Sequence, residues 1–330
     1  MQTLQDTAQS RDQHEISIRH LPVNLFASVM GISGLALAWR VAAHQYGVGA
    51  LVSDFASSLA IGLFVILAVS YLCKAIRYPQ AVLGEFRHPI AGNFFGTVPI
   101  AVLLISSLIA PVAPVLAEVV WTVGSIATIV LAFTIFSRLV KGEIDAGHAL
   151  PAWLIPGVAT LDIAVAGGTL PMEWARELNI FSLAIGTIIA LVFFTMIVSR
   201  LIHHDKLPSN MVPSLMIMIA PFEVGFLAYT NFTREIDAFA AVLFYFGLFL
   251  FLALFGKVFR RSIPFTAGWW GVSFPVAALT NAALKYAEAT KVWPLAVLAL
   301  VLLAFLTVVI VVLLVRTIRS LTNGQLLSGR

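Results

Sequence analysis

Long apolar stretches alternate with short polar loops along almost the whole chain. Ten of these stretches could each cross the roughly 30 Å hydrocarbon core of a bilayer as an α-helix. The predicted helices cover residues 21–43, 55–76, 89–110, 115–137, 150–168, 179–201, 210–230, 238–258, 265–286 and 293–316. Strands of a membrane barrel would instead give short segments of alternating polarity. The pattern therefore predicts an all-α integral membrane protein.

The composition supports this fold class. Hydrophobic residues make up 60% of the chain and charged residues 11%, whereas a typical soluble domain has about 25% charged residues. We expect a polar tail over residues 1–20, a ten-helix domain over 21–320 and a second tail over 321–330. A signal peptide cleaved near Ala38 is the competing interpretation of the first stretch, but the polar leader is long and the apolar run continues to Ala43.

The basic residues indicate how the helices are oriented. Fifteen of the twenty lysine and arginine residues fall on the side of the N-terminal tail, of the loops after predicted helices two, four, six and eight, and of the C-terminus. The other five are Arg40, Arg176, Arg234, Lys285 and Lys291. Because cytoplasmic loops carry the excess of positive charge, both termini are predicted to be cytoplasmic. The expected location is the inner, cytoplasmic membrane.

Four odd-numbered predicted helices share a proline near the middle. These prolines are Pro99, Pro156, Pro221 and Pro275, spaced by 57, 65 and 54 residues. The first helix has Gly31 at a similar depth, and the even-numbered helices lack the pattern. A spacing near sixty residues equals one helical hairpin, so the pattern predicts five tandem hairpins. Repeats that run in the same direction are related by an axis along the membrane normal.

A proline inside a helix removes one backbone hydrogen bond and kinks the helix. An unpaired carbonyl facing lipid would cost several kcal/mol, so kinked helices are expected to face protein or a water-filled path. Four kinks at matched depth therefore predict an inner ring of odd-numbered helices. The simpler alternative is that proline is common in membrane helices generally.

The order and spacing of several short motifs resemble one known family, the plant guard-cell slow anion channels and the bacterial tellurite-resistance protein TehA. The motifs are Leu21-Pro22-Val23, Gly31, His88-Pro89, Val98-Pro99-Ile100, Ala220-Pro221, Trp269-Trp270 and Ser273-Phe274-Pro275. The resemblance implies ten helices arranged as five hairpins with quasi-fivefold symmetry and an inner pore ring. It also implies a homotrimer with one pore per protomer and conduction of small anions such as chloride and nitrate.

The same resemblance implies that Phe274 lies across the pore, where a large apolar ring would block ions by sterics and dewetting. From the residues alone, Phe274 is one of 24 phenylalanines and could equally be an ordinary core residue. The chain departs from the bacterial relative at Val29, where that relative has a proline. Two acids deep within the predicted helices, Asp162 and Glu223, are further departures.

An acid inside the membrane is costly, so it normally faces the protein interior or a partner. Asp162 could be protonated, could pair with Arg40 or Lys285, or could lie outside the pore. Glu223 lies two residues after Pro221, about 200° around the helix, and is expected to point into helix packing as a neutral or hydrogen-bonded group. A proton-coupling carboxyl is the alternative for Glu223.

Three classes of function are considered. A passive anion channel fits a pore with few fixed charges, with Arg87 and His88 as an inner rim that concentrates anions. A secondary carrier that exports dicarboxylates such as malate, or oxyanions such as tellurite, is the alternative, and Glu223 would suit proton coupling. A membrane enzyme or receptor is disfavoured because catalytic motifs and soluble domains are absent from the sequence.

Other chemistry is also disfavoured by the sequence. It has no GxxxxGK motif, no HExxH motif and no cluster of cysteine and histidine, so we expect no nucleotide-driven transport, no metal and no cofactor. The single cysteine, Cys73, excludes an intrachain disulfide. Basic residues are scattered singly, so no nucleic acid partner is expected, and the predicted partners are inorganic anions and the bilayer.

Overall fold

The structure, a computed structural model, describes residues 17–142 and 145–328, and this part of the chain is helical with no β-strand. Most of the predicted N-terminal tail lies outside the described residues. Eight described helical segments are long and apolar enough to cross a membrane: Val23–Tyr46, Leu51–Arg77, Ala91–Ile109, Pro114–Val140, Glu173–His203, Ser209–Thr233, Ala238–Val258 and Trp293–Thr322. The chain is thus a multi-pass membrane protein.

Two further predicted helices also form. Pro151–Gly167 is apolar but short, and α11 (Trp270–Thr290) contains Asn281, Lys285 and Glu288, which reduce its hydropathy. Length and composition alone therefore do not identify these two segments as membrane spans. Both segments nevertheless pack between the long apolar helices of the bundle, as their contacts show.

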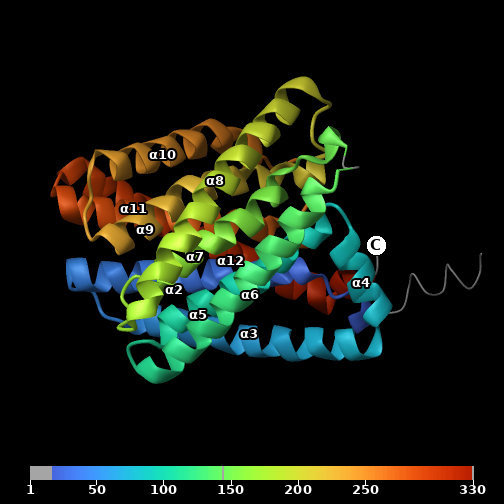
Figure 1. Cartoon of the computed structure of the whole chain (residues 1–330), viewed down its shortest axis with the longest axis horizontal. Helices are drawn as coiled ribbons and strands as arrows, with labels where there is room; N and C mark the ends of the chain where they lie inside the picture. Colours follow the sequence, from blue (N-terminus) through green and yellow to red (C-terminus); the bar gives the residue numbers. More distant parts are fainter. Residues whose placement is uncertain (1–16, 143–144, 329–330) are drawn as a thin grey trace, which may run out of the picture.

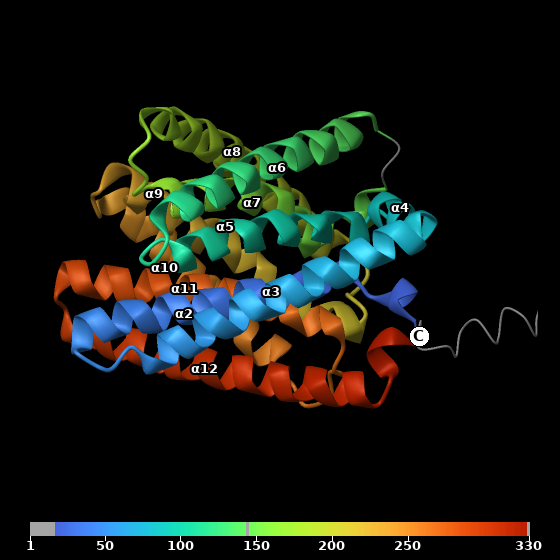
Figure 2. The same cartoon turned by 90° about the horizontal axis from the view of Figure 1, so that it is seen from below.

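Five helices close a ring in the interior of the bundle (Figures 1 and 2). The ring helices are α2 (Phe26–Tyr46), α5 (Thr97–Ile109), α7 (Leu154–Gly167), α9 (Ala220–Thr233) and α11. Each contacts the next one along the chain, and α11 returns to contact α2. Residues as far apart in sequence as Ala27 and Ser273 thus lie side by side.

The remaining long helices surround this ring. These outer helices are α3 (Leu51–Arg77), α6 (Pro114–Val140), α8 (Glu173–His203), α10 (Ala238–Val258) and α12 (Trp293–Thr322). Figure 1 shows α3 and α10 at opposite edges, and Figure 2 shows α8 and α12 at opposite edges. Each ring helix contacts the outer helix that follows it in sequence.

Burial separates the two sets of helices. In the most apolar stretch of the ring segments Val23–Tyr46, Ala91–Ile109 and Ser209–Thr233, 67–78% of residues are buried, against 17–39% in the outer helices. Large apolar side chains such as Ile66, Phe133 and Phe249 are exposed on the outer helices. An exposed apolar surface of this extent fits a hydrocarbon solvent.

Each ring helix begins with a short 3₁₀ segment. These segments are η2 (Val23–Leu25), η3 (Ala91–Gly96), η5 (Pro151–Trp153), η6 (Ser209–Ile219) and η7 (Ala267–Trp269). Residues of η2, η3, η5 and most of η6 are buried within the bundle, whereas η7 is half-buried. Backbone groups outside an α-helix must find partners away from lipid.

Pro99 and Pro221 lie near the middle of the continuous segments Ala91–Ile109 and Ser209–Thr233, as expected, but the backbone changes from 3₁₀ to α-helix there. Pro99, Pro156 and Pro221 lie in the first turn of an α-helix, directly after the 3₁₀ segment, while Pro275 lies inside α11. In the first turn of an α-helix a backbone N–H has no partner within that helix, so a proline there removes no α-helical hydrogen bond. The first three prolines therefore mark a change of helix type rather than a kink within one α-helix.

A buried ion pair holds the segment before α2. Lys74 Nζ lies 2.6 Å from Glu85 Oε2 and donates to the carbonyl of Leu21 at 2.8 Å. Glu85 Oε1 accepts from the backbone N–H of Val23 at 2.7 Å, and Glu85 Oε2 accepts from the Tyr71 hydroxyl at 2.9 Å. These bonds connect α3 and the short helix α4 (Pro79–Arg87) to the start of the first ring helix.

Helices α2 and α11 approach each other closely. A Cβ atom at Gly31 would lie 2.5 Å from Ser273 Cβ, and one at Gly34 would lie 2.6 Å from Ala277 Cβ. Ser273 Oγ donates to the carbonyl of Trp270 at 2.7 Å and lies 3.3 Å from the carbonyl of Ala27 across the contact. Helix α2 runs without interruption through Gly31, so this glycine makes room for its neighbour.

We expect Gly31→Ala to destabilise the protein by about 1–3 kcal/mol, because the added methyl group overlaps α11. The thermal unfolding of purified protein in detergent, followed by fluorescence-detected size exclusion, measures this effect. Gly62→Ala on α3 is the control, since a Cβ there meets nothing within 4 Å. Equal unfolding temperatures for the two variants would contradict the close contact.

Candidate functional site

Three cavities follow one another through the ring. Cavity A, about 370 Å³, is lined by all five ring helices, from Phe274 to Glu288 on α11. Cavity B, about 30 Å³, shares Phe274 with cavity A, and cavity C, about 460 Å³, shares Phe94 with cavity B.

The order of the cavities is the same along every ring helix. On α9 and its 3₁₀ segment the lining residues run from Asn210 and Ser214 in cavity C, through Ile217 in cavity B, to Val224 and Asn231 in cavity A. The steps of three or four residues keep one helix face towards the interior of the ring. The cavities therefore form a single file across the bundle.

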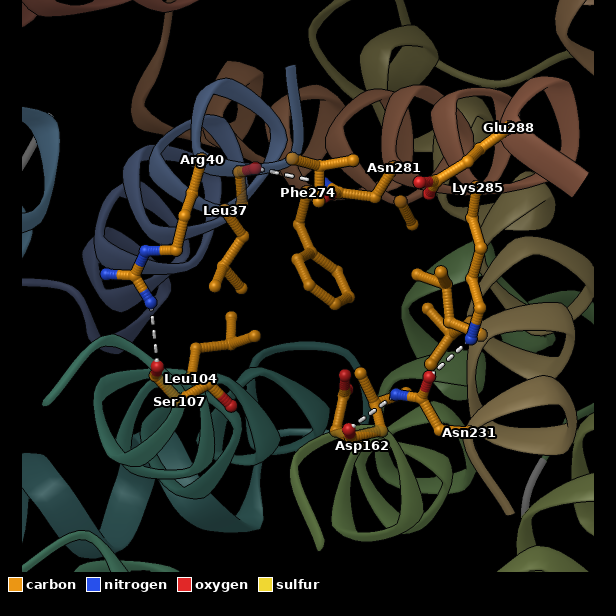
Figure 3. A pocket seen from close by; sticks show the side chains of 16 residues that line it. Leu37, Arg40, Leu104, Ser107, Asp162, Asn231, Phe274, Asn281, Lys285 and Glu288 are labelled. Atoms are coloured by element: carbon orange, nitrogen blue, oxygen red, sulfur yellow. Dashed lines mark hydrogen bonds between the residues drawn. The ribbon is translucent and has the colours of Figure 1, made fainter. Parts of the chain in front are cut away.

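Phe274 stands where cavities A and B meet. Its ring projects into cavity A, as Figure 3 shows, and its side chain is 7% exposed. Cavity B is walled by apolar side chains, among them Met30, Ile100, Ile155 and Val158. The narrowest part of the file is thus apolar, with one aromatic ring at its end.

Cavity A carries the polar groups of the file. Arg40 donates to the carbonyls of Ser107 and Leu108, each at 3.1 Å, at the end of α5. Cations at a helix C-terminus are stabilised by the helix dipole. The guanidinium is thereby fixed beside the cavity (Figure 3).

A chain of hydrogen bonds links α11, α9 and α7 across cavity A. Lys285 Nζ donates to Asn231 Oδ1, and Asn231 Nδ2 donates to the carbonyl of Val165 at 2.8 Å. One turn earlier on α11, Asn281 Nδ2 donates to the carbonyl of Gly34 on α2 at 2.9 Å. Lys285 can make three hydrogen bonds, so its ammonium retains donors for a ligand.

Asp162 lies on α7 in the wall of cavity A and is 1% exposed. Neither expected base pairs with it, because Arg40 bonds to α5 and Lys285 bonds to Asn231. Within the described residues its Oδ2 atom has no hydrogen-bond partner. Asp162 therefore neither pairs with a base nor lies outside the cavities, so protonation is the alternative that matches this geometry.

Glu223 points away from all three cavities. It is fully buried against α10, where a Cβ at Gly247 would lie 2.7 Å from its Cδ. The direction agrees with the helical angle from Pro221, but within the described part of the chain neither carboxyl oxygen has a hydrogen-bond partner. Gly247 is the residue that makes space for this acid.

Arg87 and His88 do not line the file. They lie in a separate cavity of about 320 Å³, together with Arg138 and Lys141. His88 Nδ1 accepts from the backbone N–H groups of Ile90 and Ala91, so it caps the 3₁₀ segment η3. Arg87 and His88 thus lie beside the passage and not in its lining, whereas Arg40 and Lys285 line cavity A.

From the sequence, Arg40 and Lys285 were predicted only as partners for an acid. One signal in the sequence could have placed Arg40 and Lys285 in the passage. The lining residues recur at steps of three and four residues along each odd-numbered helix. On α11 they include Phe274, Ala278, Asn281 and Lys285.

Apolar helices around a file of cavities define a polytopic membrane transport protein. The chain belongs to the voltage-dependent anion channel (SLAC1) family, whose family model matches residues 20–318. This confirms the resemblance seen in the sequence. The family transports anions across membranes and is not a family of enzymes.

Individual relatives are distant but align over most of the chain. The S-type anion channel SLAH2 of Arabidopsis thaliana is 25% identical over 85% of this chain and 55% of its own length. The guard cell S-type anion channel SLAC1 of the same plant is 25% identical over 84% of this chain and 52% of its own. The chain thus spans about half the length of these plant relatives.

A bacterial relative matches along most of its length. The tellurite resistance protein TehA homolog of Haemophilus influenzae is 25% identical over 92% of each chain. The family model, over residues 20–318, spans all five ring helices.

We expect Glu223→Gln to leave anion flux unchanged, because residue 223 packs against Gly247 outside the passage. The amide also preserves the shape of the side chain, so folding yield should change little. Flux from liposomes, measured with a chloride probe and a pH probe together, tests this expectation. Proton movement that accompanies anion flux in the parent protein and disappears in Glu223→Gln would contradict it.

Proposed function

We propose that the protein is a passive channel for small monovalent anions such as chloride and nitrate. In this proposal cavities A, B and C form the conduction path through each protomer, and Phe274 closes it. The position of Phe274 between cavities A and B is the observation that carries the proposal. A bulky apolar ring in a narrow apolar segment blocks ions by sterics and dewetting.

The polar lining of cavity A supports selectivity for anions. Lys285 and Arg40 line cavity A together with the acids Asp162 and Glu288. Glu288 accepts a hydrogen bond from Gln45, and the two bases raise the local concentration of anions. Neither base reaches cavity B, so an anion that leaves cavity A finds no strong binding group at the constriction. Weak binding along the path favours conduction, because an ion must also leave.

The finer architecture is part of the same proposal. We infer ten membrane spans, arranged as five tandem hairpins with quasi-fivefold symmetry, with the odd-numbered spans as the pore ring. The closed circuit of contacts and the 3₁₀ segment before each ring helix support this arrangement. Assembly as a homotrimer, location in the inner membrane and cytoplasmic termini belong to the proposal as well.

A secondary carrier of dicarboxylates or oxyanions is the second candidate. One observation favours the carrier. Cavity A holds two bases and the unpaired acid Asp162, and these groups could bind and release a substrate. Glu223 gives it no support, since this residue lies outside the cavities. Sustained ionic current across a bilayer distinguishes a channel from a coupled carrier.

We expect Phe274→Ala to raise anion conductance at least about tenfold, which corresponds to a barrier lower by about 1.4 kcal/mol. The physical reason is the loss of the aromatic ring at the junction of cavities A and B. Current recordings in oocytes or planar bilayers measure the effect. Phe249→Ala on the exposed face of α10 is the control and should leave the current unchanged. An unchanged current from folded Phe274→Ala protein would refute the closure at this residue.

A further inference from the structure

A fourth cavity lies outside the ring. Cavity D, about 290 Å³, is formed by the end of α10, the segment that leads to η7, and α12. Its walls include Phe259, Trp269, Phe305 and Val308, and three arginines line it: Arg260, Arg261 and Arg316. It shares only Phe265 with cavity C, so it is a site distinct from the passage.

Cavity D opens towards the side of the bundle that faces lipid. Val308 and Val312 line it and are 61% and 44% exposed on the outer helix α12. A ligand in cavity D is therefore in contact with the hydrocarbon. The apolar walls favour a hydrocarbon chain over water.

The three arginines lack an acidic partner in this region. Between residues 238 and 328 the sequence contains one acid, Glu288, and that residue lines cavity A. Arg260 Nε donates to the carbonyl of Gly256 at 2.9 Å, and the Arg316 guanidinium lies 5.7 Å from the centroid of the Phe265 ring. Within the described residues none of the three forms an ion pair with a carboxylate. Three positive charges at the edge of an apolar groove would be complemented by a ligand with an anionic group and an apolar part.

We propose that cavity D binds an anionic diacyl phospholipid, with its phosphate between the three arginines and an acyl chain in the apolar groove. Guanidinium groups suit phosphate because their parallel N–H donors match its oxygens. Basic pockets between membrane helices hold anionic head groups in this way. A free inorganic anion would satisfy the arginines but would leave the apolar walls without a ligand.

Trp269 provides a probe inside the site. The protein is reconstituted in phosphatidylcholine vesicles that contain increasing fractions of phosphatidylglycerol brominated near the ester end of its chains. Bromine quenches the fluorescence of tryptophan that it contacts, and comparison with Trp269→Phe isolates the signal of this residue among seven tryptophans. We expect quenching of Trp269 to saturate at a low fraction of brominated phosphatidylglycerol and not of brominated phosphatidylcholine.

Substitution of the arginines should remove this preference. Each arginine changed to glutamine should lower the relative affinity for phosphatidylglycerol about fivefold. The triple variant Arg260→Gln, Arg261→Gln and Arg316→Gln is compared with a charge-matched triple variant of exposed bases elsewhere, Arg77→Gln, Lys141→Gln and Lys206→Gln. The second triple variant should retain the preference.

One further variant keeps the test valid if the arginine variant does not fold. Val308→Phe fills the groove, retains all three arginines and should weaken the quenching by lipid chains. Equal quenching of Trp269 by the two brominated lipids would overturn the proposal. Absence of any quenching, as when another protomer occupies cavity D, would also overturn it.

Discussion

The contact between α2 and α11 is the constraint on which the rest of the ring depends. Gly31 and Gly34 leave no space for a Cβ atom, so the two helices interlock through Ser273 and Ala277. Ser273 faces α2, and the next residue is turned about 100° around the helix. This rotation directs Phe274 into the file of cavities. A bulkier residue at position 31 would therefore alter both the closure of the ring and the direction of the Phe274 side chain.

The ring in turn permits polar chemistry inside a membrane protein. Asn281, Lys285 and Asp162 would be costly on a surface that faces lipid. The outer helices present mainly apolar side chains, so the polar residues of the ring meet one another and the cavities instead. The low hydropathy of α11 has the same cause, since this helix is shielded by α12 and by its ring neighbours.

Much of this arrangement could be predicted from the sequence, and the rest could not for physical reasons. Apolar length identified the helical membrane class, and the spacing of Pro99, Pro156, Pro221 and Pro275 indicated which helices lie inside. The 3₁₀ segments were missed because they depend on tertiary packing as well as on proline. The position of Arg87 and His88 beside the passage was not predicted, because the direction of the loop after α4 cannot be inferred from charge alone. The role of Phe274 came from family resemblance, since composition does not separate it from 23 other phenylalanines.

Accessibility of single cysteines tests most directly whether cavities A, B and C form one passage closed at Phe274. With Cys73 replaced by serine, cysteine is introduced at Ala278 in cavity A or at Ala267 in cavity C. A small anionic thiol reagent that does not cross lipid is then added to one side of the membrane. A closed passage predicts that the two cysteines react from opposite sides only, and that each becomes reactive from both sides when Phe274 is replaced by alanine. Reaction of both cysteines from the same side in the parent protein would contradict a single passage closed at this residue.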